Sequence, residues 1–161
     1  MKDENLSKLR AMLEAYKERA ESKPPIKALA HESQRRACGE KLRRLVRPLL
    51  DIVMGELRQA GHEASTRDNT DLDNAYPSVA LSFTPRVGAP GSQFALASAL
   101  IFRYDPRHGV VVQGEVKPAP NARVVTGATG QRLGTIGVDA LSAEWVETKT
   151  LNFIHAVLKA N

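Results

Sequence analysis

The chain has 161 residues, of which 42% are apolar and 25% are charged, a balance that is ordinary for a soluble globular protein. A disordered chain would be poorer in apolar residues. No apolar run approaches the roughly 20 residues that a helix needs to span a bilayer. The single cysteine, Cys38, excludes an internal disulfide framework and a zinc site built from several cysteines. The polar amino terminus, MKDENLSKLR, lacks the apolar segment of a secretory signal, so we expect a cytoplasmic protein with no membrane partner.

Residues 3–22, DENLSKLRAMLEAYKERAES, predict an amphipathic helix. Pro24 and Pro25 end it, because proline lacks an N–H and restricts the residue before it. An isolated helix of this length is only marginally stable in water, so we expect residues 1–23 to form a helical arm that pairs with another chain or folds back. The contact surface is a stripe of apolar residues at steps of three and four: Leu6, Leu9, Leu13 and Tyr16.

A second helix is predicted from residue 26 to residue 60. Its apolar residues keep one stripe across Pro48, which favours a kink at the proline over two unrelated helices. The alternative is a fresh helix with Pro48 at its first position, where proline is tolerated. Gly61 follows this segment and suits a left-handed cap at the end of the helix.

After Gly61 the apolar period changes to that of a strand, and residues 62–138 predict antiparallel strands. The clearest signal is a hairpin over residues 98–116, in which side chains alternate on both sides of the sequence DPRHG. This sequence supplies Asp, Pro and Gly at the positions that a tight turn favours. The remaining candidate strands are residues 62–68, 78–85, 123–127 and 134–138.

The last predicted element is a helix over residues 142–160, with Ser142 as its N-cap. Helices and strands are segregated along the chain, which predicts an α+β fold: N-terminal helices are followed by an antiparallel sheet, and the C-terminal helix packs on that sheet. We expect one α+β domain over residues 24–161, apart from the arm. The predicted buried stripe of the last helix is Val146, Thr150, Leu151, Ile154, Val157 and Leu158.

The sequence VVTGATGQRLG at residues 124–134 contains three glycines after an apolar run. Its TGATG core resembles the nucleotide-binding loop of the short-chain and extended dehydrogenases, which would imply a pyrophosphate bound at a helix N-terminus. The glycines are spaced G-x-x-G-x-x-x-G, with Leu133 where the last glycine would be needed, and no helical period follows them. We therefore interpret this segment as a structural turn and expect no cofactor.

The net charge of +5 is concentrated in residues 24–47, which carry seven basic and two acidic side chains. At about 100° per residue, Arg36, Arg43 and Arg47 fall on one flank of the predicted helix. A line of arginines can neutralise nucleic-acid phosphates, but this segment lacks interleaved aromatic residues for base stacking. The other interpretation is a solvated helix face, or arginines paired with acidic residues of another helix.

No other group of residues indicates a chemistry. The four histidines are far apart and have no metal-binding spacing, and Cys38 is interpreted as a half-buried helix residue rather than a nucleophile. The acidic sequence DNTDLD at residues 68–73 lacks the glycine and the distal glutamate of a calcium-binding loop, so we interpret it as a solvated loop. We assign no catalytic, cofactor-binding or metal-ligating residues.

These patterns favour a non-enzymatic module for protein–protein interaction and assembly, in an unknown process. We expect a homodimer formed through the stripe of the N-terminal helix, and a further protein partner. One alternative is a nucleic-acid-binding accessory protein that uses the arginine-rich helix over residues 35–47. A second alternative is a small-ligand-binding or catalytic pocket between the sheet and a helix.

Overall fold

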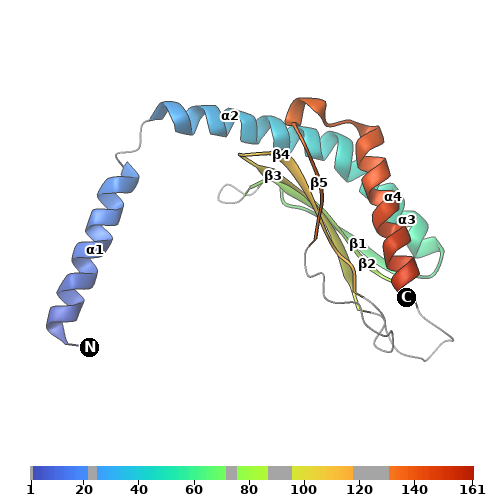
Figure 1. Ribbon diagram of the computed structural model, residues 1–161, viewed down its shortest axis with the longest axis horizontal. Helices are drawn as coiled ribbons and strands as arrows, with labels where there is room; N and C mark the ends of the chain where they lie inside the picture. Colours follow the sequence, from blue (N-terminus) through green and yellow to red (C-terminus); the bar gives the residue numbers. More distant parts are fainter. Residues whose placement is uncertain (1, 22–24, 72–75, 87–95, 118–130) are drawn as a thin grey trace. The chain divides into compact units, whose positions relative to one another are not determined.

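The computed structural model describes residues 2–21, 25–71, 76–86, 96–117 and 131–161 of the chain (Figure 1). The chain divides into two compact units, Met1–Ser33 and Gln34–Asn161. The first unit holds helix α1 (Asp3–Glu21) and the beginning of helix α2 (Pro25–Lys41). The second unit holds the rest of α2 and every later element.

The chain stays helical through Pro48. Helix α2 leads into a π-helical turn, Leu42–Val46, and helix α3 (Arg47–Gln59) follows directly. Proline has no N–H to donate to the carbonyl four residues earlier, and its ring clashes with that carbonyl in an ordinary α-helix. In the wider turn, the Arg47 N–H donates to the carbonyl of Leu42, five residues back, which makes room for the proline ring. Helix α3 ends at Gln59, and Gly61, which follows the C-cap residue Ala60, has a φ of 92° that confirms the predicted left-handed cap.

Five strands form one antiparallel sheet in the order β1-β2-β3-β4-β5, so that each strand pairs with its neighbour in sequence. Together with the helices, this sheet confirms the predicted α+β fold. The strands are β1 (Glu63–Asp68), β2 (Ser78–Thr84), β3 (Ser98–Asp105), β4 (Gly109–Glu115) and β5 (Gln131–Ile136).

Strands β3 and β4 form the predicted hairpin, with Asp105 paired to Gly109 across the turn. The Asp105 carboxylate accepts a hydrogen bond from the Arg107 N–H at 2.7 Å, which is the local closure that aspartate provides at the start of a turn. Gly109 has a φ of 93°, a conformation that side chains with a Cβ rarely adopt.

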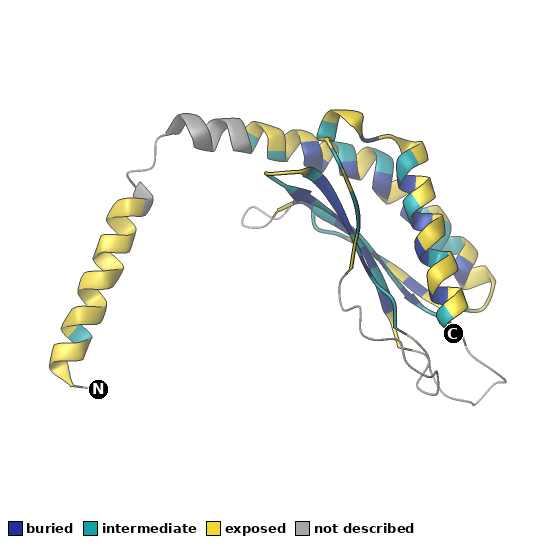
Figure 2. Cartoon of the chain, in the orientation of Figure 1, coloured by how far each residue is buried: buried dark blue, intermediate teal, exposed yellow. Residues whose placement is uncertain are grey.

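The core lies on one face of the sheet, beneath α3 and α4 (Ala143–Ala160) (Figures 1 and 2). Helix α3 contacts β1 and β2, and α4 contacts β3 and α3. Burial alternates along β2 and β3, as expected for strands with one face against a core. The core residues are Cys38, Leu42, Val46, Leu50, Leu57, Ala64, Val79, Leu81, Phe83, Leu100, Phe102, Tyr104, Val110, Val112, Leu141, Val146, Phe153 and Val157.

The N-cap of α4 is the predicted one: the Ser142 hydroxyl accepts a hydrogen bond from the Trp145 N–H at 3.2 Å. The buried stripe of α4 differs from the prediction, because Phe153 is buried while Leu151 and Leu158 are 61% and 48% exposed. These two leucines lie one position beyond the residues that face the sheet, a rotation of about 100° around the helix axis. The buried residues are Val146, Thr150, Phe153 and Val157.

Strand β5 includes the last four residues of the glycine-containing segment, 131–134, where the sequence predicted a turn and a strand only from residue 134 to residue 138. They pair with β4 instead, through a register shift that leaves Leu133 as an extra residue between Arg132 and Gly134. The turn prediction fails here because glycine is compatible with an extended strand as well as with a turn, so pairing with β4 decides the conformation. Residues 124–130 of the same segment lie outside the described part of the chain.

Candidate functional site

Helix α1 carries the apolar stripe predicted to mediate assembly. Leu6 is half-buried, while Leu9, Leu13 and Tyr16 are 41%, 59% and 68% exposed. Met12, next to the stripe, is 62% exposed, and α1 is exposed along most of its length (Figure 2). Large apolar side chains gathered on one surface are a feature of interaction sites.

The basic segment is held in contact with the acidic sequence that begins at Asp68, the last residue of β1. The Arg43 guanidinium donates to the Thr70 hydroxyl at 2.8 Å and forms an ion pair with Asp71. Arg47 donates to the Asp68 carboxylate at 3.0 Å. The sequence showed the basic flank and the acidic cluster separately, but no local signal indicated that they meet.

Asp68 is the centre of this contact. Partial burial alone would raise the pKa of Asp68, but two hydrogen bonds from Thr70 and the charges of Arg47 and Arg43 outweigh it, and the pKa is lowered. The side chain is 17% exposed, compared with 87% for Asp71. Asp73, the third aspartate of the predicted acidic loop, lies outside the described residues.

The third arginine of the predicted flank, Arg36, is exposed on α2. Arg43 lies in the π-helical turn and Arg47 at the start of α3. A phosphate approaching Arg43 or Arg47 would compete with carboxylates that already bind these side chains. Arg43 and Arg47 are thus paired with acidic residues, but these lie at the end of β1 and in the turn after it, and not on another helix as the second interpretation had it.

Cys38 is fully buried rather than half-buried. Burial raises the pKa of Cys38 to about 12, against a smaller lowering effect of Lys41. The thiolate is the reactive form of cysteine, so a buried neutral thiol is inert toward electrophiles at neutral pH. Among the described residues, no group of histidine, cysteine, aspartate or glutamate side chains could hold a metal ion.

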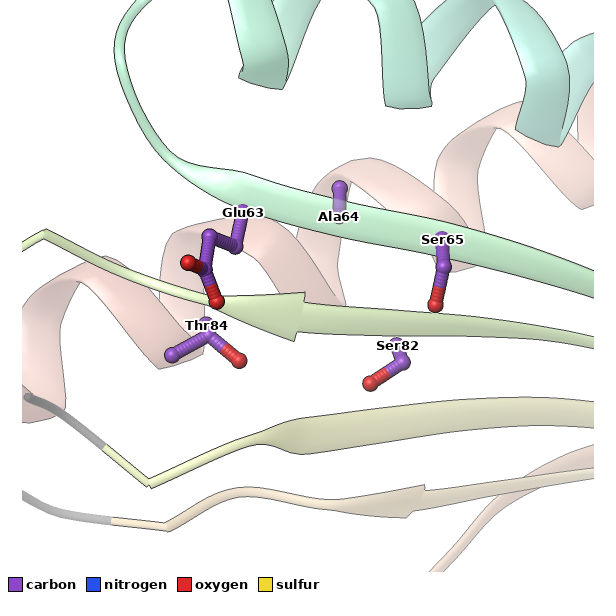
Figure 3. A pocket seen from close by; sticks show the side chains of 5 residues that line it. All are labelled: Glu63, Ala64, Ser65, Ser82 and Thr84. Atoms are coloured by element: carbon purple, nitrogen blue, oxygen red, sulfur yellow. The ribbon is translucent and has the colours of Figure 1, made fainter.

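An open hollow of about 320 Å³ lies over the beginning of β1 and the end of β2 (Figure 3). Figure 3 shows Glu63, Ser65, Ser82 and Thr84 directed to one side of the sheet, while Ala64 points toward the helices. The described lining therefore offers hydroxyl groups and one carboxylate. It includes neither a histidine nor a lysine that would activate a hydroxyl as a nucleophile.

A second hollow, of about 190 Å³, lies between β4, β5 and α4. A pocket between the sheet and a helix was the second alternative function predicted from the sequence. Lys149 is one of the residues that line this hollow, and the ammonium group of Lys149 donates to the Leu133 carbonyl at 3.0 Å. The lining residues are Gly114, Val116, Gln131, Leu133, Lys149, Asn152, Phe153 and Ala156.

None of the described helices is long and apolar enough to cross a membrane. No protein-family model, no curated protein and no solved structure matches this chain. The basis for a functional inference is therefore the arrangement of its own residues.

Proposed function

We propose that this chain is a non-enzymatic assembly module, active in the cytoplasm, that forms a homodimer through α1. The observation that carries the proposal is the exposure of three large apolar side chains, Leu9, Leu13 and Tyr16, on one helix. With Leu6 they follow steps of three, four and three, which is the repeat that lets two helices pack side chains into each other's gaps.

The expected affinity is modest. Burying a leucine fully contributes about 1.5–3 kcal/mol, and two copies of the stripe contribute six leucines and two tyrosines. Association itself costs about 4–15 kcal/mol in lost freedom, and short helices bury such side chains only in part. These terms place the dissociation constant in roughly the micromolar range, so the dimer should dissociate on dilution.

The sheet supports the second part of the proposal, a further protein partner. On the face opposite the core, the strand register places Arg67, Ala80, Ile101 and Gln113 in one row across four strands. The described helices α3 and α4 pack on the other face. A row of small, charged and apolar side chains suits a protein surface that is partly polar and partly apolar.

Light scattering and sedimentation of the full chain across a dilution series test the dimer. The variant Leu9→Gln/Leu13→Gln should be monomeric at concentrations where the parent is dimeric, because glutamine keeps the helix but removes the apolar contact. The control variant Ala11→Gln/Ala15→Gln changes residues off the stripe and should dimerise like the parent. A parent that is monomeric at every concentration, or a stripe variant that dimerises as well as the control, contradicts the proposal.

Nucleic-acid binding through Arg36, Arg43 and Arg47 is the competing function. It predicts affinity for DNA or RNA that falls steeply with salt, with a slope that shrinks by about one unit per phosphate contact removed. Replacing Arg43 and Arg47 by glutamine should leave dimer formation unchanged under our proposal. Salt-dependent binding lost in that variant would favour the competing function instead.

A further inference from the structure

Two glycines, Gly114 and Gly134, leave room for side chains that line the hollow between β4, β5 and α4. A Cβ on Gly114 would lie 2.6 Å from the Cδ1 of Leu133, and one on Gly134 would lie 2.9 Å from the Nζ of Lys149. Real Cβ atoms do not approach other heavy atoms so closely. The absence of a Cβ at these two positions therefore leaves room for the ends of the Leu133 and Lys149 side chains.

The bulge in β5 fixes the position of the positive charge. Leu133 is the extra residue of the bulge, opposite the step from Val112 to Gln113. Its carbonyl accepts a hydrogen bond from Lys149 at 3.0 Å, and the ammonium group also lies 5.6 Å from the centre of the Trp145 ring. Both contacts hold the lysine in one conformation beside the hollow.

Lys149 keeps hydrogen-bonding capacity for a ligand. An ammonium group has three N–H donors, and the Leu133 carbonyl takes one of them. Within the described ranges of the chain, Lys149 forms no ion pair with a carboxylate. The ammonium group of a half-buried lysine, held by these contacts and without a counter-ion among the described residues, is a good partner for an anionic oxygen.

The other lining residues of the hollow are of two kinds, apolar residues that are buried or half-buried and polar residues that are exposed. Val116, Leu133 and Phe153 are buried or half-buried and form an apolar surface. Gln131 and Asn152 are exposed and carry amide N–H groups. A site with an apolar surface and a few polar groups on one side selects amphipathic molecules.

We propose that this hollow binds a small organic monocarboxylate. The carboxylate takes the free donors of Lys149, and a short alkyl chain or a single ring packs on Val116, Leu133 and Phe153. The volume of about 190 Å³ sets the size, since an apolar cavity of about 150 Å³ is enough to hold benzene. This site is separate from α1, so the inference stands independently of the assembly function.

Titration of the full chain with hexanoate tests the site, and Trp145 reports on it. Trp145 is the single tryptophan of the sequence and lies beside Lys149, so binding should produce a saturable change in its fluorescence. Hexanol, which has the same alkyl chain without the charge, should bind about ten- to hundredfold more weakly, the usual effect of losing a charge-assisted hydrogen bond. Calorimetry of the same titration gives a measurement that does not depend on the fluorophore.

Three variants complete the experiment. Lys149→Met keeps the apolar stem and should weaken hexanoate binding by about ten- to hundredfold, while Lys159→Met, on the same helix, should bind like the parent. Ala156→Phe places a large side chain at the hollow and should abolish binding without altering Lys149. No saturable signal in the parent, equal affinities for hexanoate and hexanol, or undiminished binding in both Lys149→Met and Ala156→Phe overturns the proposal.

Discussion

Asp68 is the residue through which the basic helical segment is joined to the sheet. It ends β1, and its carboxylate accepts hydrogen bonds from Arg47 and from the backbone N–H of Thr70. Both partners favour the ionised form, which is why the pKa of Asp68 is lowered from its ordinary value of 3.8. A group whose pKa is lower in the folded chain than in the unfolded chain stabilises the fold when it is ionised.

Asp68 should therefore make stability depend on pH. The stabilisation by ionised Asp68 is fully present above the pKa of the unfolded chain and is lost as the pH falls through the pKa of the folded chain. The loss should therefore begin near pH 5 and continue below pH 3.8. Asp68→Asn should lower the free energy of unfolding at pH 7 by about 1–2 kcal/mol, as measured by urea denaturation. The difference from the parent should narrow at pH 3, where the parent carboxylate is also being protonated.

Asp71→Asn is the matched control, because Asp71 pairs with Arg43 but is 87% exposed. An exposed ion pair contributes little, so this variant should lie within about 0.5 kcal/mol of the parent. If Asp71→Asn costs as much as Asp68→Asn, or if the Asp68→Asn deficit is the same at pH 3 and pH 7, the role given to Asp68 is wrong.

The turn of the β3–β4 hairpin depends on the backbone conformation of Gly109. Gly109 has a φ of 93°, and a Cβ at this position would lie 2.6 Å from the Ile136 carbonyl oxygen of β5. Gly109→Ala should therefore destabilise the chain by about 1–3 kcal/mol from the backbone conformation, with a further cost from the clash with β5. Thermal and urea unfolding, followed by circular dichroism, measure the effect.

Gly137 provides the control for the hairpin prediction. Its φ is −62°, and an added Cβ would meet nothing within 4 Å among the described residues. Gly137→Ala should be neutral or stabilise the chain by about 0.4–1 kcal/mol, because alanine reduces the freedom of the unfolded chain. Equal losses of stability in the two variants would show that the Gly109 conformation is not what the hairpin requires.

At the scale of elements, the sequence predicts the turns and helix caps that are formed by residues close to one another in the chain. The hairpin turn, the Ser142 N-cap and the Gly61 cap all depend on residues within a few positions of one another, and the structure contains all three. The buried face of α4 was predicted less well, because its apolar residues cover a wider arc than the sheet buries. Whether Phe153 or Leu151 faces the core is decided by the position of the sheet.

The candidate sites depend on contacts between distant residues, and this is why the sequence predicted them only in part. Arg43 and Asp71 are 28 residues apart, and their contact requires the path from the helix through β1. The hollow beside Lys149 similarly requires Gly114, on β4, to lie next to Leu133. The stripe of α1 is different, because its residues lie close together on one helix, and helical periodicity alone places them on one face.

At the scale of the whole molecule, every described residue of the hydrophobic core lies in the second compact unit. The first residue of the core is Cys38 and its last is Val157, so none of the α1 side chains that the structure describes belongs to it. Removal of residues 1–23 should therefore leave a chain that folds cooperatively, with a thermal transition close to that of the full-length chain. Because the proposed interface is removed, the truncated chain should also be monomeric where the full-length chain is dimeric.

Light scattering and circular dichroism on the truncated and full-length chains separate the possible roles of α1. A folded monomer after truncation, together with a full-length dimer, is the expected result, since the stripe is needed only between copies. An unfolded truncated chain would show that α1 packs on the core of its own chain. A truncated chain that remains dimeric would show that the interface lies in the second unit. The row of residues from Arg67 to Gln113 across the sheet would then be the first surface to test.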